Sequence, residues 1–163
     1  MEETYGPVLG HEVRAARGTE PAGAAIAASL LLDRTFGQDD ITVLRHQVND
    51  RLVRAGFSGD GLSGFVLAVN EIITNVVLHG GGHGRLTLSL ADGSAWCTVT
   101  DSGPGIPQQH LTPPDVPEAF ELGGRGLWLA YQLCDEVTMA TGPIGTTIGL
   151  RMVLPGTSLP IDA

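Results

Sequence analysis

One long segment with helical periodicity constrains the fold of this chain more than any other feature of its sequence. We expect a helix that begins near Asp60 or Ser63 and ends at His79, because large apolar residues recur there every three or four positions. The main apolar stripe consists of Leu62, Phe65, Val66, Val69, Ile73, Val76 and Val77. A stripe of this length has to be buried against another layer of structure. The sequence GGGHG that follows the helix predicts a mobile loop, because it is so rich in glycine.

The segments around this helix predict a sheet and two further helices. Asp92-Gly93 is typical of a tight hairpin turn between two alternating segments. The expected strands cover residues 29–36, 85–90, 95–100, 136–141 and 146–154. The expected helices, besides the long one, cover residues 39–54, capped by Asp39 or Asp40, and 124–134. Adjacent strands favour hairpins, so we predict a two-layer α/β sandwich with a mixed, mainly antiparallel sheet and helices on one face.

Length and charge narrow the classes of function. The 163 residues suit one domain, which we expect at 29–155, between a mobile arm at 1–28 and a loose tail at 156–163. All nine basic residues are arginine and the net charge is −9, which argues against direct binding to nucleic acid or to an anionic membrane. The absence of lysine excludes a P-loop. We expect a cytoplasmic protein in which Cys97 and Cys134 are reduced, buried thiols and Trp96 and Trp128 pack in the core.

Two polar residues of the long helix lie opposite the middle of its main stripe. At about 100° per residue, Glu71 and Asn75 fall about 180° and 220° from Leu62. A solvated face would explain them, but Leu67, Ala68 and Leu78 flank them, which favours a covered ligand pocket. An amide and a carboxylate offer the oxygen atoms that Mg²⁺ prefers, and a carboxylate beside the metal could accept a proton.

Three glycine-containing motifs follow in the chain. They are Asp101-Ser102-Gly103-Pro104-Gly105 after a strand, Gly124-Arg125-Gly126 at the start of a helix, and Gly145-Thr146-Thr147 at the start of the last strand. A helix start supplies free N–H groups for an anion. Residues 106–122 form a long, proline-interrupted loop, which is more typical of a functional segment than of a simple connection. Each motif alone could be an ordinary turn or helix start.

Taken together and in this order, the motifs resemble those of the GHKL (histidine-kinase-like) ATPase superfamily, whose members share a Bergerat-type ATP-binding fold. The resemblance covers about residues 30–154. The segments NEIITNVVLHGG and GGRGLWLAYQLCDEV are most similar to bacterial anti-sigma factors that are also serine/threonine protein kinases. A lysine that is common in histidine kinases is replaced by Leu78 here, which argues against an isolated histidine-kinase fragment.

The resemblance implies a role for each matching residue. Glu71 would be the catalytic base, Asn75 the Mg²⁺ ligand, and Asp101 the partner of the adenine amino group, with residues 106–122 as the ATP lid. The other implied nucleotide-binding residues are Gly103, Gly105, Gly124, Arg125, Gly126, Leu127 and Thr146. Arg125 could also reach a phosphate oxygen, because of its charge and its place between two glycines.

Two functions remain open at this stage. In the first, the protein uses Mg²⁺ and ATP to phosphorylate a serine or threonine of an anti-sigma factor antagonist of the STAS type, and it sequesters a sigma factor, as a homodimer. In the second, the protein is a binding module that ATP switches, without phosphotransfer. The presence of Glu71 favours the first, because a module that only binds has no use for a base.

Overall fold

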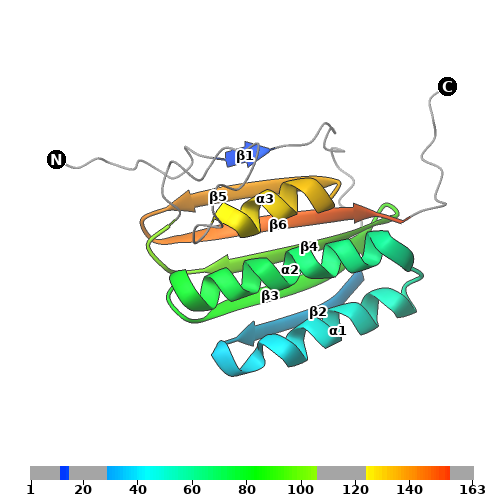
Figure 1. The fold of residues 1–163 in the computed structure, drawn as a ribbon, viewed down its shortest axis with the longest axis horizontal. Coiled ribbons are helices and arrows are strands. Elements are labelled where there is room, and N and C mark those ends of the chain that lie inside the picture. Colours follow the sequence, from blue (N-terminus) through cyan, green and yellow to red (C-terminus); the bar gives the residue numbers. More distant parts are fainter. Residues whose placement is uncertain (1–11, 15–28, 106–123, 155–163) are drawn as a thin grey trace.

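The computed structural model describes residues 12–14, 29–105 and 124–154, and these form an α/β sandwich (Figure 1). The strands are β1 (Glu12–Arg14), β2 (Ser29–Phe36), β3 (Gly84–Ala91), β4 (Ser94–Asp101), β5 (Glu136–Gly142) and β6 (Gly145–Val153). The helices are α1 (Ile41–Arg54), α2 (Gly59–His79) and α3 (Gly124–Leu133), and a 3-10 turn (Gln38–Asp40) precedes α1. The predicted order of elements is confirmed from β2 onward.

The six strands form one sheet in the order β1-β5-β6-β4-β3-β2. Each neighbouring pair is antiparallel, so within the described residues the sheet is entirely antiparallel and not mixed as predicted. The three helices lie on one face, with α1 over β2 and α3 over β5 and β6 (Figure 1). The predicted two-layer sandwich is therefore confirmed.

Strand β1 is an addition that the sequence analysis does not predict. It lies within the expected arm, and its Glu12 pairs with Ala140 at the edge of the sheet. The rest of the arm, the expected lid at 106–122 and the expected tail at 156–163 lie outside the described residues.

Helix α2 is the centre of the core, as its apolar stripe predicts. Six of the seven predicted stripe residues are buried and Val77 is half-buried, and Ala68 and Ile72 are buried as well. Burying each large side chain contributes about 1.5–3 kcal/mol before the entropy cost of ordering it. In the described part of the chain, α2 is the one helix that is long and apolar enough to cross a membrane, and its buried side chains belong to the core of this domain.

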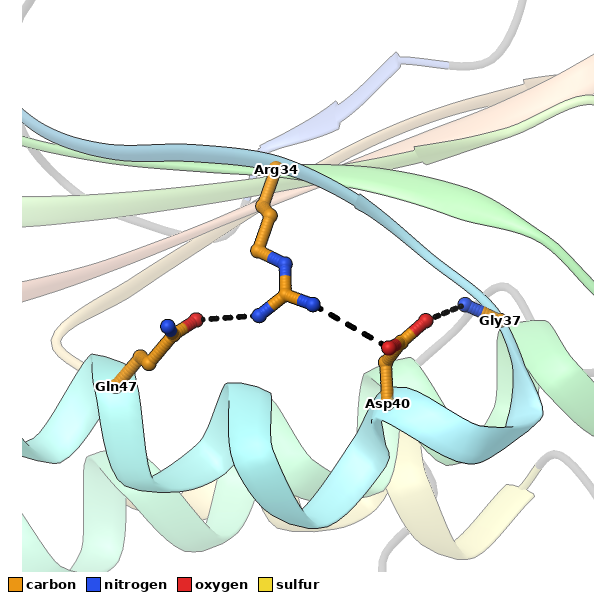
Figure 2. Close-up of polar contacts among 4 residues, drawn as sticks. All are labelled: Arg34, Gly37, Asp40 and Gln47. Atoms are coloured by element: carbon orange, nitrogen blue, oxygen red, sulfur yellow. Dashed lines mark hydrogen bonds and ion pairs between the residues drawn. The ribbon is translucent and has the colours of Figure 1, made fainter.

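Asp40 takes the N-cap position of α1, as predicted, but its side chain makes no capping hydrogen bond to this helix. The Asp40 carboxylate accepts the Gly37 N–H at 2.9 Å and a hydrogen bond from Arg34 at 3.3 Å, so it closes the preceding turn and does not cap α1 (Figure 2). Arg34 also donates to the Gln47 side chain at 2.7 Å. These contacts attach the end of β2 to the first turns of α1. Helix α2 likewise begins earlier than predicted, after Ser58.

The cysteines and tryptophans are only partly where the sequence places them. Both thiols are free, with Cys97 buried and Cys134 half-buried, and burial raises the pKa of Cys134 to about 12. Trp96 and Trp128 are half-buried and are not core residues. Trp96 lies on the helix-free face, where the Arg151 guanidinium is 5.9 Å from the centre of its ring.

Candidate nucleotide-binding site

Asp101 lies at the end of β4, where several of the sequence motifs meet. It pairs with Gly84 of β3 on one side and with Thr146 of β6 on the other. Its Oδ1 accepts the Gly103 N–H at 2.8 Å. Burial raises the pKa of Asp101, while the N–H groups of Gly103 and Thr146 oppose this shift. The carboxylate is thus held in place by the backbone in a partly desolvated position.

Thr146 lies beside Asp101 on the helix-covered face of the sheet. Its side chain is buried, and its hydroxyl shares a 2.7 Å hydrogen bond with the Thr141 hydroxyl. The Thr147 hydroxyl is instead 3.2 Å from that of Thr100, in an exposed pair on the opposite face. Thr146 is therefore the threonine of this motif that shares a face with Asp101.

The glycines after β4 are packed against two other segments. A methyl group at Gly103 would lie 2.5 Å from the carbonyl carbon of Gly80, which follows α2. A methyl group at Gly105 would overlap the carbonyl oxygen of Gly142, at the end of β5. The backbone after Asp101 is thus enclosed between the end of α2 and the turn that joins β5 to β6.

Helices α2 and α3 pack against each other in opposite directions (Figure 1). Their contact includes Gly64 near the start of α2 and Leu133 at the end of α3, where a methyl group at Gly64 would lie 3.3 Å from Leu133 Cδ2. Gly124, the first residue of α3, lies nine residues before Leu133. Because both helices rise about 1.5 Å per residue and run in opposite directions, Gly124 lies level with the residue nine positions after Gly64, which is in the Glu71–Asn75 turn. The first turn of α3 therefore lies beside the two polar residues of α2.

Glu71 and Asn75 are half-buried on the flank of α2 that faces α3. Asn75 is about 20° from Gly64 around the helix axis, and Gly64 contacts α3. Of the residues expected to be covered with them, Ala68 is buried, but Leu67 and Leu78 are 44% and 62% exposed. The face of α2 that carries Glu71 and Asn75 is therefore covered on the side of Ala68, and it is exposed at Leu67 and Leu78.

The first four residues of α3 are Gly124, Arg125, Gly126 and Leu127. Their N–H groups have no acceptor within the helix and lie at the positive end of its dipole, so they can bind an anion. The Leu127 side chain is only 2% exposed and belongs to the core, so this residue could contact a ligand only through its backbone. The side chain of Arg125 is outside the described part of the structure.

Comparison with known proteins agrees with this geometry. Residues 37–152 match the family described as "Histidine kinase-like ATPase domain". The chain belongs to this family. The predicted resemblance is thereby confirmed.

Two named relatives are similar over about half of this ATPase-domain chain. Anti-sigma F factor of Bacillus licheniformis is 32% identical over 104 residues, which cover 56% of this chain and 68% of that protein. Serine-protein kinase RsbW of Listeria monocytogenes is 34% identical over 98 residues, which cover 53% of this chain and 62% of that protein.

A solved structure shares the fold. The crystal structure of the RsbU and RsbW domains of a Mycobacterium tuberculosis protein aligns with a TM-score of 0.54 and 22% identity. The alignment covers 76% of this chain and 32% of that one. This similarity supports the α/β architecture of the histidine kinase-like ATPase domain.

The residues of this ATPase domain fit a magnesium ion that binds mainly through a nucleotide. Among the described residues, no three His, Cys, Asp or Glu side chains are grouped as a metal site. Asn75 offers one amide oxygen, and Mg²⁺ often takes one or two protein ligands while phosphates and water supply the rest. The donor set therefore suits a metal that arrives with phosphates better than a resident ion.

A cavity of about 840 Å³ lies on the other flank of α2, and the sequence analysis does not predict it. Its walls include Gly37 and Asp39 before α1, Val77 of α2, His83 of the GGGHG loop, and Asp101. Asp101 therefore lies between this cavity and the flank of α2 that faces α3. The clustering of glycines in GGGHG is the sequence signal nearest to this cavity.

Proposed function

We propose that this histidine kinase-like ATPase domain binds Mg²⁺ and ATP where α2, α3 and the end of β4 meet, and transfers the γ-phosphate to a protein serine or threonine. One observation carries the proposal. The first turn of α3, an anion site, lies beside the Glu71–Asn75 turn of α2, and Asp101 lies at the same end of the sheet. A nucleotide needs these three kinds of group: a partner for the base, donors for the phosphates, and a metal ligand.

We propose the nucleotide contacts that the family resemblance implies, and the positions above support them. The adenine amino group would donate to Asp101, with Thr146, Gly103 and Gly105 around the base and ribose. The phosphates would accept hydrogen bonds from the first N–H groups of α3, at Gly124, Arg125, Gly126 and Leu127. When bound, Mg²⁺ would be held by the Asn75 oxygen and would neutralise phosphate charge, which favours phosphoryl transfer.

Glu71 would act as the general base. It lies one helical turn before Asn75 on the same flank of α2, so its carboxylate and the Asn75 oxygen are neighbours. The substrate hydroxyl oxygen would form a bond to the γ-phosphorus while the bond between that phosphorus and the ADP oxygen breaks. Glu71 would accept the hydroxyl proton, and ADP would leave with the electron pair.

The relatives' names support the proposed partners. An anti-sigma factor and a serine-protein kinase are both among the similar proteins, so we propose a sigma factor and a STAS-type antagonist as the partners of this chain. We further propose a cytoplasmic homodimer, with the ATP-binding domain at 29–155. The net charge of −9 supports binding to proteins and not directly to nucleic acid or membrane.

The proposal is tested in two steps with the full chain. Calorimetry with ATP, with and without Mg²⁺, should show binding that depends on the metal. Incubation with ATP labelled at the γ-phosphate and a candidate antagonist should then label a serine or threonine. Binding without labelling of any partner would replace the kinase by an ATP-switched binding module, and absence of ATP binding would refute both.

A further inference from the structure

We infer that Gly80 is a positioning residue that fixes the Asp101 carboxylate for recognition of the adenine amino group. This inference rests on the proposed nucleotide binding. Gly80 is the first glycine of the GGGHG segment and follows His79, the last residue of α2. Nothing in the sequence motifs distinguishes it from the other glycines of that segment.

The contact between Gly80 and Asp101 leaves no room for a side chain. A methyl group at Gly80 would lie 2.7 Å from Asp101 Oδ2 and 2.9 Å from Asp101 Cγ. The backbone angles of Gly80, φ −102° and ψ 28°, are accessible to alanine, so glycine is not needed for its conformation. The requirement for glycine therefore comes from lack of space: the Asp101 carboxylate is nearest, and Val76 Cα would lie 3.0 Å from the same methyl group.

The backbone at Gly80 is fixed on two sides. Its N–H donates to the Val76 carbonyl at 2.8 Å, which ends α2. Gly103 packs closely on the Gly80 backbone: a methyl group added at Gly103 would lie 2.7 Å from the Gly80 Cα. A methyl group at Gly80 would meet the Asp101 carboxylate at 2.7 Å and Val76 Cα at 3.0 Å, and of these two neighbours the end of the side chain can shift more easily.

Displacement of Asp101 would change recognition of the base in particular. The carboxylate is oriented by the N–H groups of Gly103, at 2.8 Å, and Thr146, and a shift would weaken these bonds and move the carboxylate away from the base. Gly80 also ends the helix that carries Glu71 and Asn75. The contact between Gly80 and Asp101 therefore sets where the Asp101 carboxylate lies relative to Glu71 and Asn75 of α2.

The test compares two nucleotides in three variants of the full chain. ATP and purine riboside triphosphate, which lacks the 6-amino group, are titrated by calorimetry into wild type, Gly80→Ala and Gly61→Ala. Gly61 is the control, because it lies in the first turn of α2, at the other end of the helix that Gly80 follows, and a methyl group there would meet no atom within 4 Å. We expect Gly80→Ala to weaken ATP binding about tenfold or more, which is the effect of an unpaired polar group, and to change binding of the analogue by less than about twofold.

A double-mutant cycle makes the test independent of folding. In an Asp101→Ala background the two nearest atoms that the Gly80 methyl would meet, Oδ2 and Cγ of Asp101, are gone, and of the three nearest only Val76 Cα remains, at 3.0 Å. The double variant should therefore fold and should bind both nucleotides as Asp101→Ala does. Equal weakening of both nucleotides by Gly80→Ala, or a further loss of ATP affinity in the double variant, would overturn the inference. If wild type binds neither nucleotide, the proposed function itself fails, and that result is distinct from either outcome.

Discussion

Replacement of Asp101 by asparagine should stabilise the free protein while it weakens ATP binding. Burial raises the pKa of Asp101 above its ordinary value of 3.8. Because the pKa of Asp101 is higher in the folded than in the unfolded state, the folded protein holds this proton more tightly. Asp101 therefore stabilises the folded state at a pH below its unfolded-state pKa, and this stabilisation is lost as the pH rises through its folded-state pKa. At pH 7 the charged carboxylate therefore disfavours folding. A neutral amide of the same shape removes that penalty if its one oxygen, with two lone pairs, accepts the N–H groups of both Gly103 and Thr146.

The cost to binding follows from counting acceptors. The carboxylate accepts the Gly103 N–H at 2.8 Å and a second backbone hydrogen bond from Thr146, and the adenine amino group would be a third donor. An asparagine side chain has one oxygen, so its NH₂ group must face at least one of these three donors. A buried donor without an acceptor costs about 1–3 kcal/mol, which corresponds to about 5- to 150-fold in affinity.

Two measurements on the same Asp101→Asn sample test this reasoning. Calorimetry gives the dissociation constant for ATP with Mg²⁺, and urea denaturation without nucleotide gives the free energy of unfolding at pH 7 and near pH 4. The variant should be the more stable protein at pH 7, and its advantage should shrink near pH 4, where the wild-type carboxylate binds a proton. An unchanged ATP affinity would refute the role of Asp101, and a variant less stable than wild type at pH 7 would refute the pKa argument.

Three further substitutions test the remaining parts of the site and the core. Glu71→Gln should bind ATP within about twofold of wild type but slow transfer of labelled phosphate about 10²–10⁴-fold, and an unchanged rate would exclude Glu71 as the base. Asn75→Ala should weaken ATP binding in the presence of Mg²⁺ and leave metal-free binding unchanged in calorimetry; equal loss in both would exclude a metal ligand. Ile73→Ala should lower the free energy of unfolding in urea by about 2–5 kcal/mol, because Ile73 is fully buried in α2. A loss below about 1 kcal/mol would mean that the α2 core is loosely packed.

The parts of the fold that the sequence predicts well are those with strong local signals. The stripe of α2 specifies a buried helix over five turns, and most of its members are buried as expected. The hairpin of β3 and β4 turns at Asp92 and Gly93, whose φ angles of 50° and 73° are those that this dipeptide adopts readily. Such features depend on neighbouring residues and therefore appear in the sequence itself.

Features that depend on distant partners are harder to predict. Strand β1 has three residues and forms only by pairing with β5, more than a hundred positions along the chain, so it has no periodicity to detect. The sequence analysis predicts a core position for Trp96, and that prediction is wrong. Alternation with the buried Cys97 places Trp96 on the opposite face of the sheet, where its ring lies beside Gly149 of β6.

In the candidate site, too, features set by neighbouring residues can be predicted and features set by distant partners cannot. The spacing of Glu71 and Asn75 predicts that they share one side of α2, but it does not show which neighbour that side faces. The contact between Gly64 and Leu133 supplies this information, because it places α3 along the same flank. A glycine in a helix is a weak sequence signal, and only the packed structure shows that it admits a second helix.

The glycines of the GGGHG segment have structural roles that composition alone does not distinguish. Composition predicts a mobile loop, and the structure adds a spatial or conformational reason for each glycine. Gly80 leaves space for Asp101, whereas Gly81 and Gly82 have φ angles of 93° and 88°, which other residues rarely adopt. Gly84 pairs in β3, and a methyl group there would lie 2.8 Å from the Phe36 ring. The segment is thus shaped by contacts on both sides, and its Gly82, His83 and Gly84 line the 840 Å³ cavity together with Asp101, the group proposed to bind adenine.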